Sequence, residues 1–283
     1  MPKTILRWIL PTAALLLLGP LVGALVAALR DSNGSPDATL LVSTSPLLGL
    51  LALLLLTLFA GAGGAVTARL TNPGTARTFA GLCAAWAAIR TADSWNMLMV
   101  QGPAVITPLA IEAILVAAAG VVITAALMVA GGSHDHAAFR RDLTTALKGP
   151  GAPLGIAVGV AGGAVAAWLV ALDGIRGQCL MAGVLGSVLA AVGVQLASPN
   201  LSFDQARLRA TAAVLLLALL SPLSLLIMPG AGAIADAART GSLVGPGLVQ
   251  PLDWLVGLFL GIPTGLHWVG SVAEKAQHQH APR

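Results

Sequence analysis

Residues 104–130, AVITPLAIEAILVAAAGVVITAALMVA, form an apolar stretch of 27 residues in which Glu112 is the one charged side chain. An α-helix rises about 1.5 Å per residue, so about 20 apolar residues cross the hydrocarbon core of a bilayer. This stretch is long enough to span a membrane, and it predicts a transmembrane helix.

The composition of the whole chain favours the same environment. Of its 283 residues, 57% are hydrophobic and only 9% are charged, whereas about 25% of the residues in soluble domains are charged. The mean hydropathy is +0.89. We therefore expect an all-α polytopic transmembrane bundle that forms one domain over residues 1–283, with the lipid bilayer as its surroundings.

Apolar stretches of membrane-spanning length occur eight times. The first begins like a signal peptide, with Lys3 and Arg7 before an apolar run, but that run is longer than a typical signal-peptide core. We expect it to be the first transmembrane helix. The predicted spans are residues 5–29, 47–68, 79–100, 104–130, 154–172, 177–197, 210–228 and 252–273.

The basic residues between the spans predict the orientation. Both chain ends lie on one side if there are eight spans. That side carries 11 Lys and Arg residues and the other side carries 3, with Arg90 inside a span. Positive residues concentrate on the cytoplasmic side, so both termini are expected in the cytoplasm of a cell membrane of the bacterial inner-membrane type. Residues 131–153 would form a cytoplasmic loop with a short amphipathic helix, and residues 229–251 an outer loop.

The polar segment inside the third predicted span is the main candidate site. On a continuous helix, Arg90 and Asp93 are three residues apart and lie on one face. Glu112 would reach a similar depth on the next helix. We therefore predict an intramembrane charge cluster of Arg90, Asp93 and Glu112, with Trp86 and Asn96 as neighbouring polar residues. Because unpaired charges in lipid are costly, this cluster would be either a structural clamp or part of an ion or substrate path.

Glycines repeat every four residues on the fifth and eighth spans. Such stripes let helix backbones approach closely in a membrane. They predict either ordinary packing inside the bundle or a face for another subunit. The glycines are Gly155, Gly159, Gly163, Gly257, Gly261 and Gly265.

Motifs of known chemistry are missing from the sequence. Cys83 and Cys179 fall in apolar stretches and are expected to be buried thiols. His134 and His136 flank Asp135, but no further residue completes a zinc ligand set. The sequence therefore suggests no metal, no cofactor and no nucleic-acid partner.

Three functions remain open on the sequence alone. The first is a non-catalytic, membrane-embedded subunit or scaffold of a larger membrane complex, with other membrane subunits or further copies of the chain as partners. The second is a secondary transporter or channel for an ion or small solute that uses the Arg90, Asp93 and Glu112 cluster. The third is a membrane enzyme, whose catalytic residues would come from Asp93, Glu112, Asp173 or His267.

Overall fold

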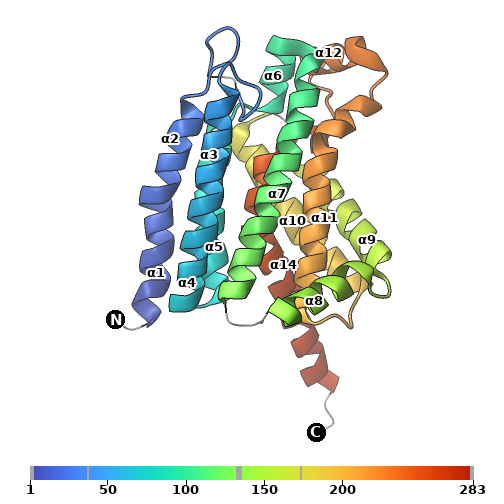
Figure 1. Ribbon diagram of the computed structural model, residues 1–283. Helices are drawn as coiled ribbons and strands as arrows, with labels where there is room; N and C mark the ends of the chain where they lie inside the picture. The colour runs from blue at the N-terminus through green and yellow to red at the C-terminus, as the bar shows by residue number, and fades with distance from the viewer. Residues whose placement is uncertain (1–2, 37, 132–135, 173, 281–283) are drawn as a thin grey trace.

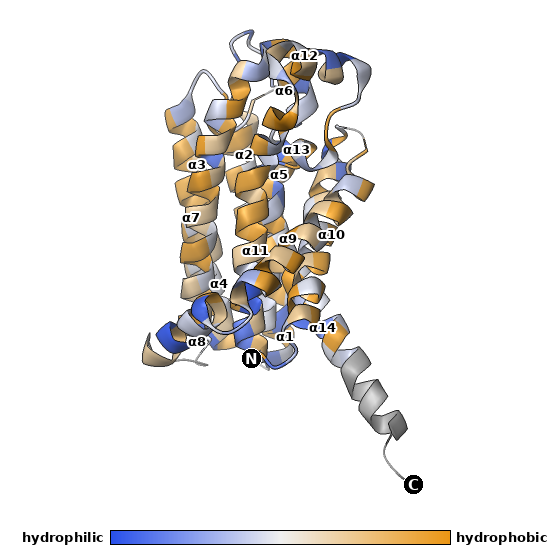
Figure 2. Cartoon of the chain, turned by 90° about the vertical axis from the view of Figure 1, so that its right-hand side faces the viewer, coloured by the Kyte–Doolittle hydropathy of each residue, from blue (hydrophilic) through white to orange (hydrophobic). Residues whose placement is uncertain are grey.

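The chain forms a bundle of long, roughly parallel and antiparallel helices in a computed structural model that describes residues 3–36, 38–131, 136–172 and 174–280 (Figure 1). These residues form helices and loops and contain no strand. Hydrophobic residues dominate the middle of the bundle, while hydrophilic residues gather toward its ends (Figure 2). Large apolar side chains such as Leu54 and Leu169 are more than half exposed, as expected of a surface in contact with lipid. The predicted fold class is confirmed.

Seven stretches of the described chain are long and apolar enough to cross a membrane. One of them, Pro73–Ala130, has 58 residues, which would measure about 87 Å as one straight helix. It is instead divided into the separate helices α5 and α7, so the described residues pass through the bundle eight times. The passes are α1 to α2 (Lys3–Ala27), α3 to α4 (Pro46–Leu70), α5 (Pro73–Arg90), α7 (Ile106–Ala130), α9 (Ala152–Val170), α10 (Arg176–Ala197), α11 (Phe203–Ser224) and α14 (Pro251–His280).

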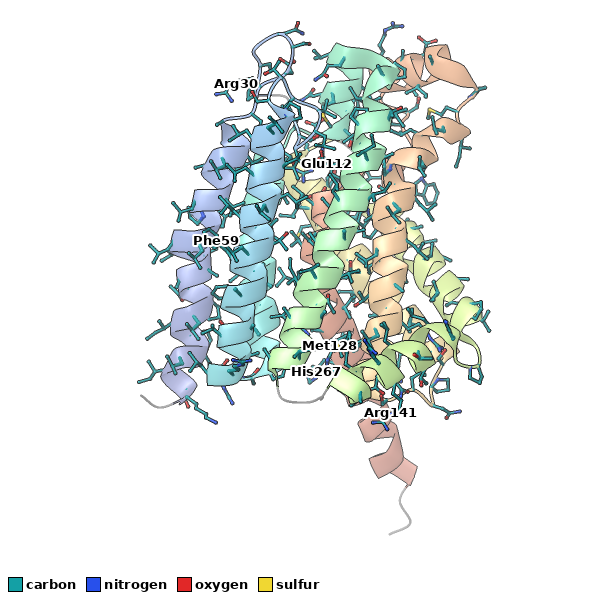
Figure 3. All side chains as sticks on the ribbon, viewed as in Figure 1. Arg30, Phe59, Glu112, Met128, Arg141 and His267 are labelled. Atoms are coloured by element: carbon teal, nitrogen blue, oxygen red, sulfur yellow. The ribbon has the colours of Figure 1, made fainter. Side chains whose placement is uncertain are left out.

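The first helix begins and the last helix ends at the same end of the bundle (Figure 1). We call this the inner end, after the predicted topology, and the opposite end the outer end. Arg141 and His267 lie toward the inner end, whereas Arg30 lies at the outer end and Glu112 in the outer half (Figure 3). The assignment of the inner end to the cytoplasm stays a prediction from the charge distribution.

The predicted third span, residues 79–100, is wrong at both of its ends. Helix α5 begins earlier, at Pro73, and it stops at Arg90. The backbone of Thr91 and Asp93 is extended, with ψ angles of 152° and 154°. Arg90 therefore stands at the end of a helix in the outer part of the bundle, and not at mid-depth in a continuous span.

A capping interaction explains why the helix does not continue. The carboxylate of Asp93 accepts a hydrogen bond from the backbone N–H of Asn96 at 2.6 Å, and this starts a new short helix, α6 (Ser94–Gln101). Aspartate at a helix N-cap satisfies a backbone donor that would otherwise lack a partner. The polar residues of this segment thus start a second helix instead of forming a polar face on the first.

Both predicted loops contain helices. The amphipathic helix expected in residues 131–153 is α8 (His136–Lys148), and the outer loop contains α12 (Gly230–Thr240) and α13 (Gly245–Leu248). Fully buried Arg209 attaches α8 to the bundle, because its Nε donates to the carbonyl of Ala146 at 2.9 Å.

The connection between the first two passes folds back into the bundle. Thr39 and Leu40, at its centre, are almost completely buried. The backbone N–H of Ala92 donates to the carbonyl of Ala38 at 3.0 Å, so this loop also covers the break between α5 and α6. We call residues 28–45 the inserted loop.

The six striped glycines all lie at contacts within the chain. A Cβ atom on Gly257 would lie 2.3 Å from the carbonyl oxygen of Gly183, and one on Gly163 would lie 3.0 Å from that of Gly186. Both of these carbonyls belong to α10, so α9 and α14 pack against α10 through their glycines. This is the packing alternative of the two that the sequence left open, and it leaves these glycines unavailable as a face for another subunit.

Glycine 257 allows a test of this packing. We expect Gly257→Leu to lower the free energy of unfolding by about 1–3 kcal/mol, because the new side chain would overlap the α10 backbone. Thermal unfolding in mild detergent measures the effect. Gly270→Leu is the matched control, since a Cβ at Gly270 of the same helix meets nothing within 4 Å. Equal stability of the two variants would contradict the proposed contact.

Candidate functional site

Arg90 does not join the predicted charge cluster. Its side chain is exposed, and its guanidinium lies over the indole ring of Trp86 on the same helix, 5.7 Å from the ring centroid. In the described part of the chain, no hydrogen bond or ion pair links it to Asp93 or Glu112. The predicted contact of Arg90 with the two acids is therefore wrong. Because α5 ends at Arg90, its side chain is placed at the edge of the membrane-spanning region, where it does not need a buried partner.

Glu112 is buried, as predicted, but its contacts are different ones. It lies on α7 and is 1% exposed. Its Oε2 accepts a hydrogen bond from the hydroxyl of Thr39 at 2.7 Å and one from the backbone N–H of Leu41 at 3.0 Å. Both donors belong to the inserted loop. Within the described residues its other oxygen, Oε1, has no hydrogen-bond partner.

An ion pair between a part-buried arginine and a fully buried aspartate lies close to Glu112. Arg176, the first residue of α10, forms a two-pronged contact with Asp253 near the start of α14. The guanidinium Nη1 donates to Asp253 Oδ2 at 3.0 Å, and its Nε donates to the carbonyl of Ala88 in α5 at 2.8 Å. Asp253 is completely buried. One guanidinium thus joins the ends of three helices.

Gln250 completes this group of polar side chains. Its backbone N–H donates to Asp253 Oδ2 at 2.9 Å, and its side-chain amide donates to the carbonyl of Ala92. Glu112 is within electrostatic range of Arg176. We call Arg176, Asp253, Gln250, Glu112 and Thr39 the outer polar centre.

The outer polar centre is made of fixed contacts between elements. It connects α5, α7, α10 and α14 with the inserted loop, and most of its donors and acceptors are engaged by groups of the same chain. Asp253 pairs with Arg176 and Glu112 lies within its electrostatic range, so the arginine of this group is Arg176 and not the predicted Arg90. Such an arrangement can hold helix ends in register inside a low-dielectric region.

Sequence reasoning counted Arg176 and Asp253 only as charges at the ends of spans. A local signal for Asp253 was present, because Gln250-Pro251-Leu252-Asp253 has proline at the first helical position and an acid at the third, as helix starts often do. No comparable signal points to Arg176 as its partner, since the pairing of α10 with α14 depends on the tertiary fold.

Among the described residues named for a possible enzyme, His267 is separated from Glu112 (Figure 3). His267 lies toward the inner end and Glu112 in the outer half of the bundle (Figure 3). Asp93 and Asn96 form the cap of α6. Asp173, His134 and Asp135 lie outside the described residues. Cys83 and Cys179 are buried as thiols.

The fold and the outer polar centre define a multi-pass membrane protein with a compact helical bundle. No protein-family model, no curated protein and no solved structure matches the chain.

The buried pair gives the second prediction. Removing one partner of a buried ion pair leaves an uncompensated charge and costs about 3–5 kcal/mol. We expect Asp253→Asn to reduce the free energy of unfolding by that amount in mild detergent. The double variant Arg176→Met with Asp253→Leu should reduce it less than Arg176→Met alone or Asp253→Leu alone.

Asp236→Asn is the control for this experiment. Asp236 pairs with Arg239 on α12, and both side chains are about 70% exposed (69% and 71%), so its loss should cost at most about 1 kcal/mol. If Asp253→Asn is no more destabilising than Asp236→Asn, the buried pair does not have the structural role described here.

Proposed function

We propose that this chain is a non-catalytic, membrane-embedded subunit of a larger membrane complex. Two features support this role. The charged groups of the outer polar centre are engaged mainly with one another and with the backbone, which suits a rigid structural core. In addition, a mainly apolar groove that also carries threonines and Arg7 lies on the surface that would face lipid.

The groove arises because the first pass touches its neighbour closely only in its outer half. A Cβ on Gly19 would lie 2.3 Å from the indole of Trp86, so α2 (Gly19–Ala27) is in tight contact with α5. The Trp86 Nε1 donates to the carbonyl of Leu15 at 2.7 Å, within a π-helical turn at Ala14–Leu18. Below this turn, α1 (Lys3–Ala13) has no buried residue and a groove opens between α1 and α5.

The residues that line the groove are the main support for this role. It includes four threonines, Thr4 and Thr12 on α1 and Thr75 and Thr78 on α5, together with Arg7. Trp8 at its edge is 74% exposed. Transmembrane helices associate through close packing and through hydrogen bonds of residues such as threonine. The groove therefore suits a transmembrane helix of a partner subunit.

A bulky side chain placed in the groove tests this role. Thr78 is exposed in the groove, and we expect Thr78→Trp to prevent docking of the partner helix. Native membranes solubilised in mild detergent and separated on a native gel give the measurement. The wild-type chain should migrate well above its monomer mass of 28.3 kDa plus detergent, and Thr78→Trp should migrate as the monomer.

Thr264→Trp provides the control, since Thr264 is an exposed threonine on α14, outside the groove. It should behave like the wild type. Migration of the wild type as a monomer would refute a subunit role, and so would complexes of equal size in the wild type and Thr78→Trp.

Transport is the second candidate, and one observation favours it. Glu112 Oε1 is buried and has no partner among the described residues, and intramembrane carboxylates of this kind serve proton and ion pathways. Arg90, which the sequence assigned to the same pathway, no longer belongs to it.

Flux measurements in proteoliposomes test the transport alternative. With a pH-sensitive dye inside the vesicles and an imposed membrane potential, a transporter would admit protons faster than empty vesicles do. Glu112→Gln should then return the rate to that of empty vesicles, while Asp236→Asn on the exposed helix α12 should leave it unchanged. A wild-type rate equal to that of empty vesicles would exclude proton transport under these conditions.

A further inference from the structure

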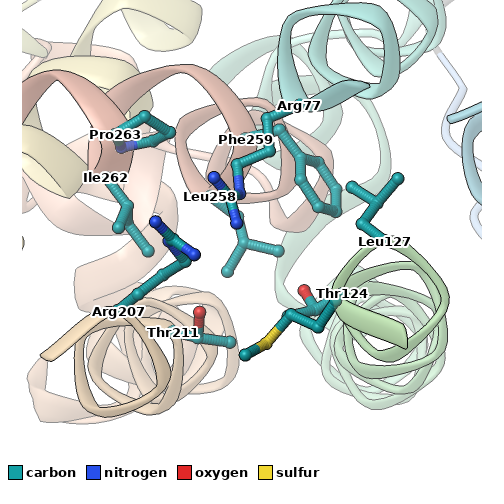
Figure 4. A pocket seen from close by; sticks show the side chains of 10 residues that line it. Arg77, Thr124, Leu127, Arg207, Thr211, Leu258, Phe259, Ile262 and Pro263 are labelled. Carbon is teal, nitrogen blue, oxygen red and sulfur yellow. The ribbon is translucent and has the colours of Figure 1, made fainter. Parts of the chain in front are cut away.

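The two ends of the bundle differ in the space that they leave for a ligand. At the inner end, Arg77 and Arg207 face each other across a pocket between α5, α7, α11 and α14 (Figure 4). Its volume is about 10 Å³, which is the space of one water molecule. At the outer end, a cavity of about 260 Å³ lies between the inserted loop and the segment that joins α6 to α7. We call it the outer cavity, and it has room for a larger ligand.

The inserted loop provides most of the polar lining of the outer cavity. The polar residues that it contributes are Asp31, Ser32, Ser43 and Thr44. The backbone N–H of Thr44 donates to the carbonyl of Arg30 at 2.8 Å, which brings the stretches around Asp31 and Ser43 together. Across the cavity, the segment that leads into α7 contributes the apolar residues Ala104, Val105 and Pro108.

Asp31 is a buried carboxylate with one unsatisfied oxygen. Its residue is 1% exposed, and its Oδ1 accepts hydrogen bonds from the backbone N–H groups of Asn33 and Ser35, both at 2.8 Å. Its Oδ2 is buried and has no hydrogen-bond partner among the described residues, and the same holds for the hydroxyl of Ser43. Because buried polar atoms almost always have a partner, these two oxygens on the wall of one cavity point to a ligand.

The charge of Asp31 is not compensated within the described part of the chain. Arg30, its neighbour in sequence, is exposed, and its Nη1 donates instead to the carbonyls of Ala27 and Leu29, both at 2.7 Å. The residues that line the outer cavity include no lysine, arginine or histidine. A buried charge is costly unless it is paired, so the missing partner of Asp31 would have to be positive.

Both unsatisfied oxygens are suitable ligands for a cation. Hard metal ions prefer carboxylate and other oxygen ligands and commonly keep water molecules in their coordination shell. An ammonium group has several N–H donors and can bind the same oxygens. A volume of about 260 Å³ leaves space for the water around a metal ion or for the carbon atoms of an amine.

From these observations, and independently of the role proposed above, we infer that the outer cavity is a cation-binding site formed by Asp31 and Ser43. Its ligand is a hydrated metal ion or the ammonium group of a small amine. Leu41 also lines the cavity, and its backbone N–H binds Glu112. A bound cation should therefore stabilise the inserted loop and its contact with the outer polar centre.

Thermal unfolding with different cations tests the site and distinguishes the two kinds of ligand. The full chain is purified in a non-ionic detergent. Sodium, calcium or ethylammonium chloride then replaces tetraethylammonium chloride at constant ionic strength. Tetraethylammonium is the reference because its ethyl groups shield its charge. A ligand that binds only the folded chain raises the melting temperature. A rise with sodium or calcium indicates a metal ion, and a rise with ethylammonium alone indicates an amine.

Variants connect the effect to the outer cavity. Asp31→Asn removes the charge but keeps an oxygen that can accept the hydrogen bonds from Asn33 and Ser35. It should weaken binding by about tenfold to a hundredfold, as expected for the loss of a bond to a charged group. The matched control is Asp236→Asn, because Asp236 is exposed on α12 at the same end of the bundle (Figure 1), and this variant should bind like the wild type.

Ser43→Ala keeps the inference testable if Asp31→Asn does not fold. It removes one of the two unsatisfied oxygens and leaves the charge of Asp31 in place, so it should bind the cation more weakly than the wild type.

Three results would overturn the inference. The first is a wild-type melting temperature that is the same in all four salts. The second is an equal loss of binding in Asp31→Asn and Asp236→Asn, which would indicate attraction to the surface charge alone. The third is wild-type affinity in Asp31→Asn or in Ser43→Ala, because the cation would then be bound elsewhere.

Discussion

The contact between Arg176 and Asp253 holds the outer half of the bundle together. Helix α10 starts at Arg176, α14 starts at Pro251 just before Asp253, and the guanidinium also binds the carbonyl of Ala88 near the end of α5. Helix termini leave backbone groups unpaired, and in a membrane these groups cannot all turn to water. The part-buried arginine binds the carbonyl of Ala88 and its acid accepts the backbone N–H of Gln250, so the pair fixes the ends of three helices relative to one another.

The contacts of α10 with α9 and α14 rely on a different principle. Lipid is as apolar as a leucine side chain, so burial of apolar surface drives helix association only weakly. The close approach of α9 and α14 to α10 replaces this driving force, because glycines at 159, 163, 257, 261 and 265 bring the backbones into direct contact. Helix α10 thus lies between the glycine faces of α9 and α14. Its outer end is the end that Arg176 links to α14.

Much of the fold could be predicted from the sequence, because the rules involved are local. Apolar length predicted the passes and their order, and the amphipathic segment before Lys148 predicted α8. The break at Thr91–Asp93 was missed because apolar residues continue on both sides of it. The sequence signal for this break was the capping pattern of Asp93 and Asn96. Such a pattern indicates the start of a helix and not a polar face on a continuous helix.

The candidate site was predicted only in part, and the reason is tertiary. The sequence named Glu112 as an intramembrane acid in a cluster with Arg90 and Asp93, whereas in the structure it is buried and accepts hydrogen bonds from Thr39 and Leu41. The donors come from the inserted loop, 71 to 73 residues away in sequence. The sequence pattern gives no indication that a polar loop folds into the bundle.

The two ends of the bundle differ in how the charge of a largely buried arginine is compensated. At the outer end, the acid that compensates Arg176 is part of the chain, and the inserted loop and α14 close over the pair. At the inner end, Arg77 and Arg207 face each other, and among the described residues the acid near both is Asp204, whose side chain is 30% exposed. A chain with 9% charged residues has few acids to place, and the described part of the chain places a fully buried aspartate beside Arg176 and not beside Arg77.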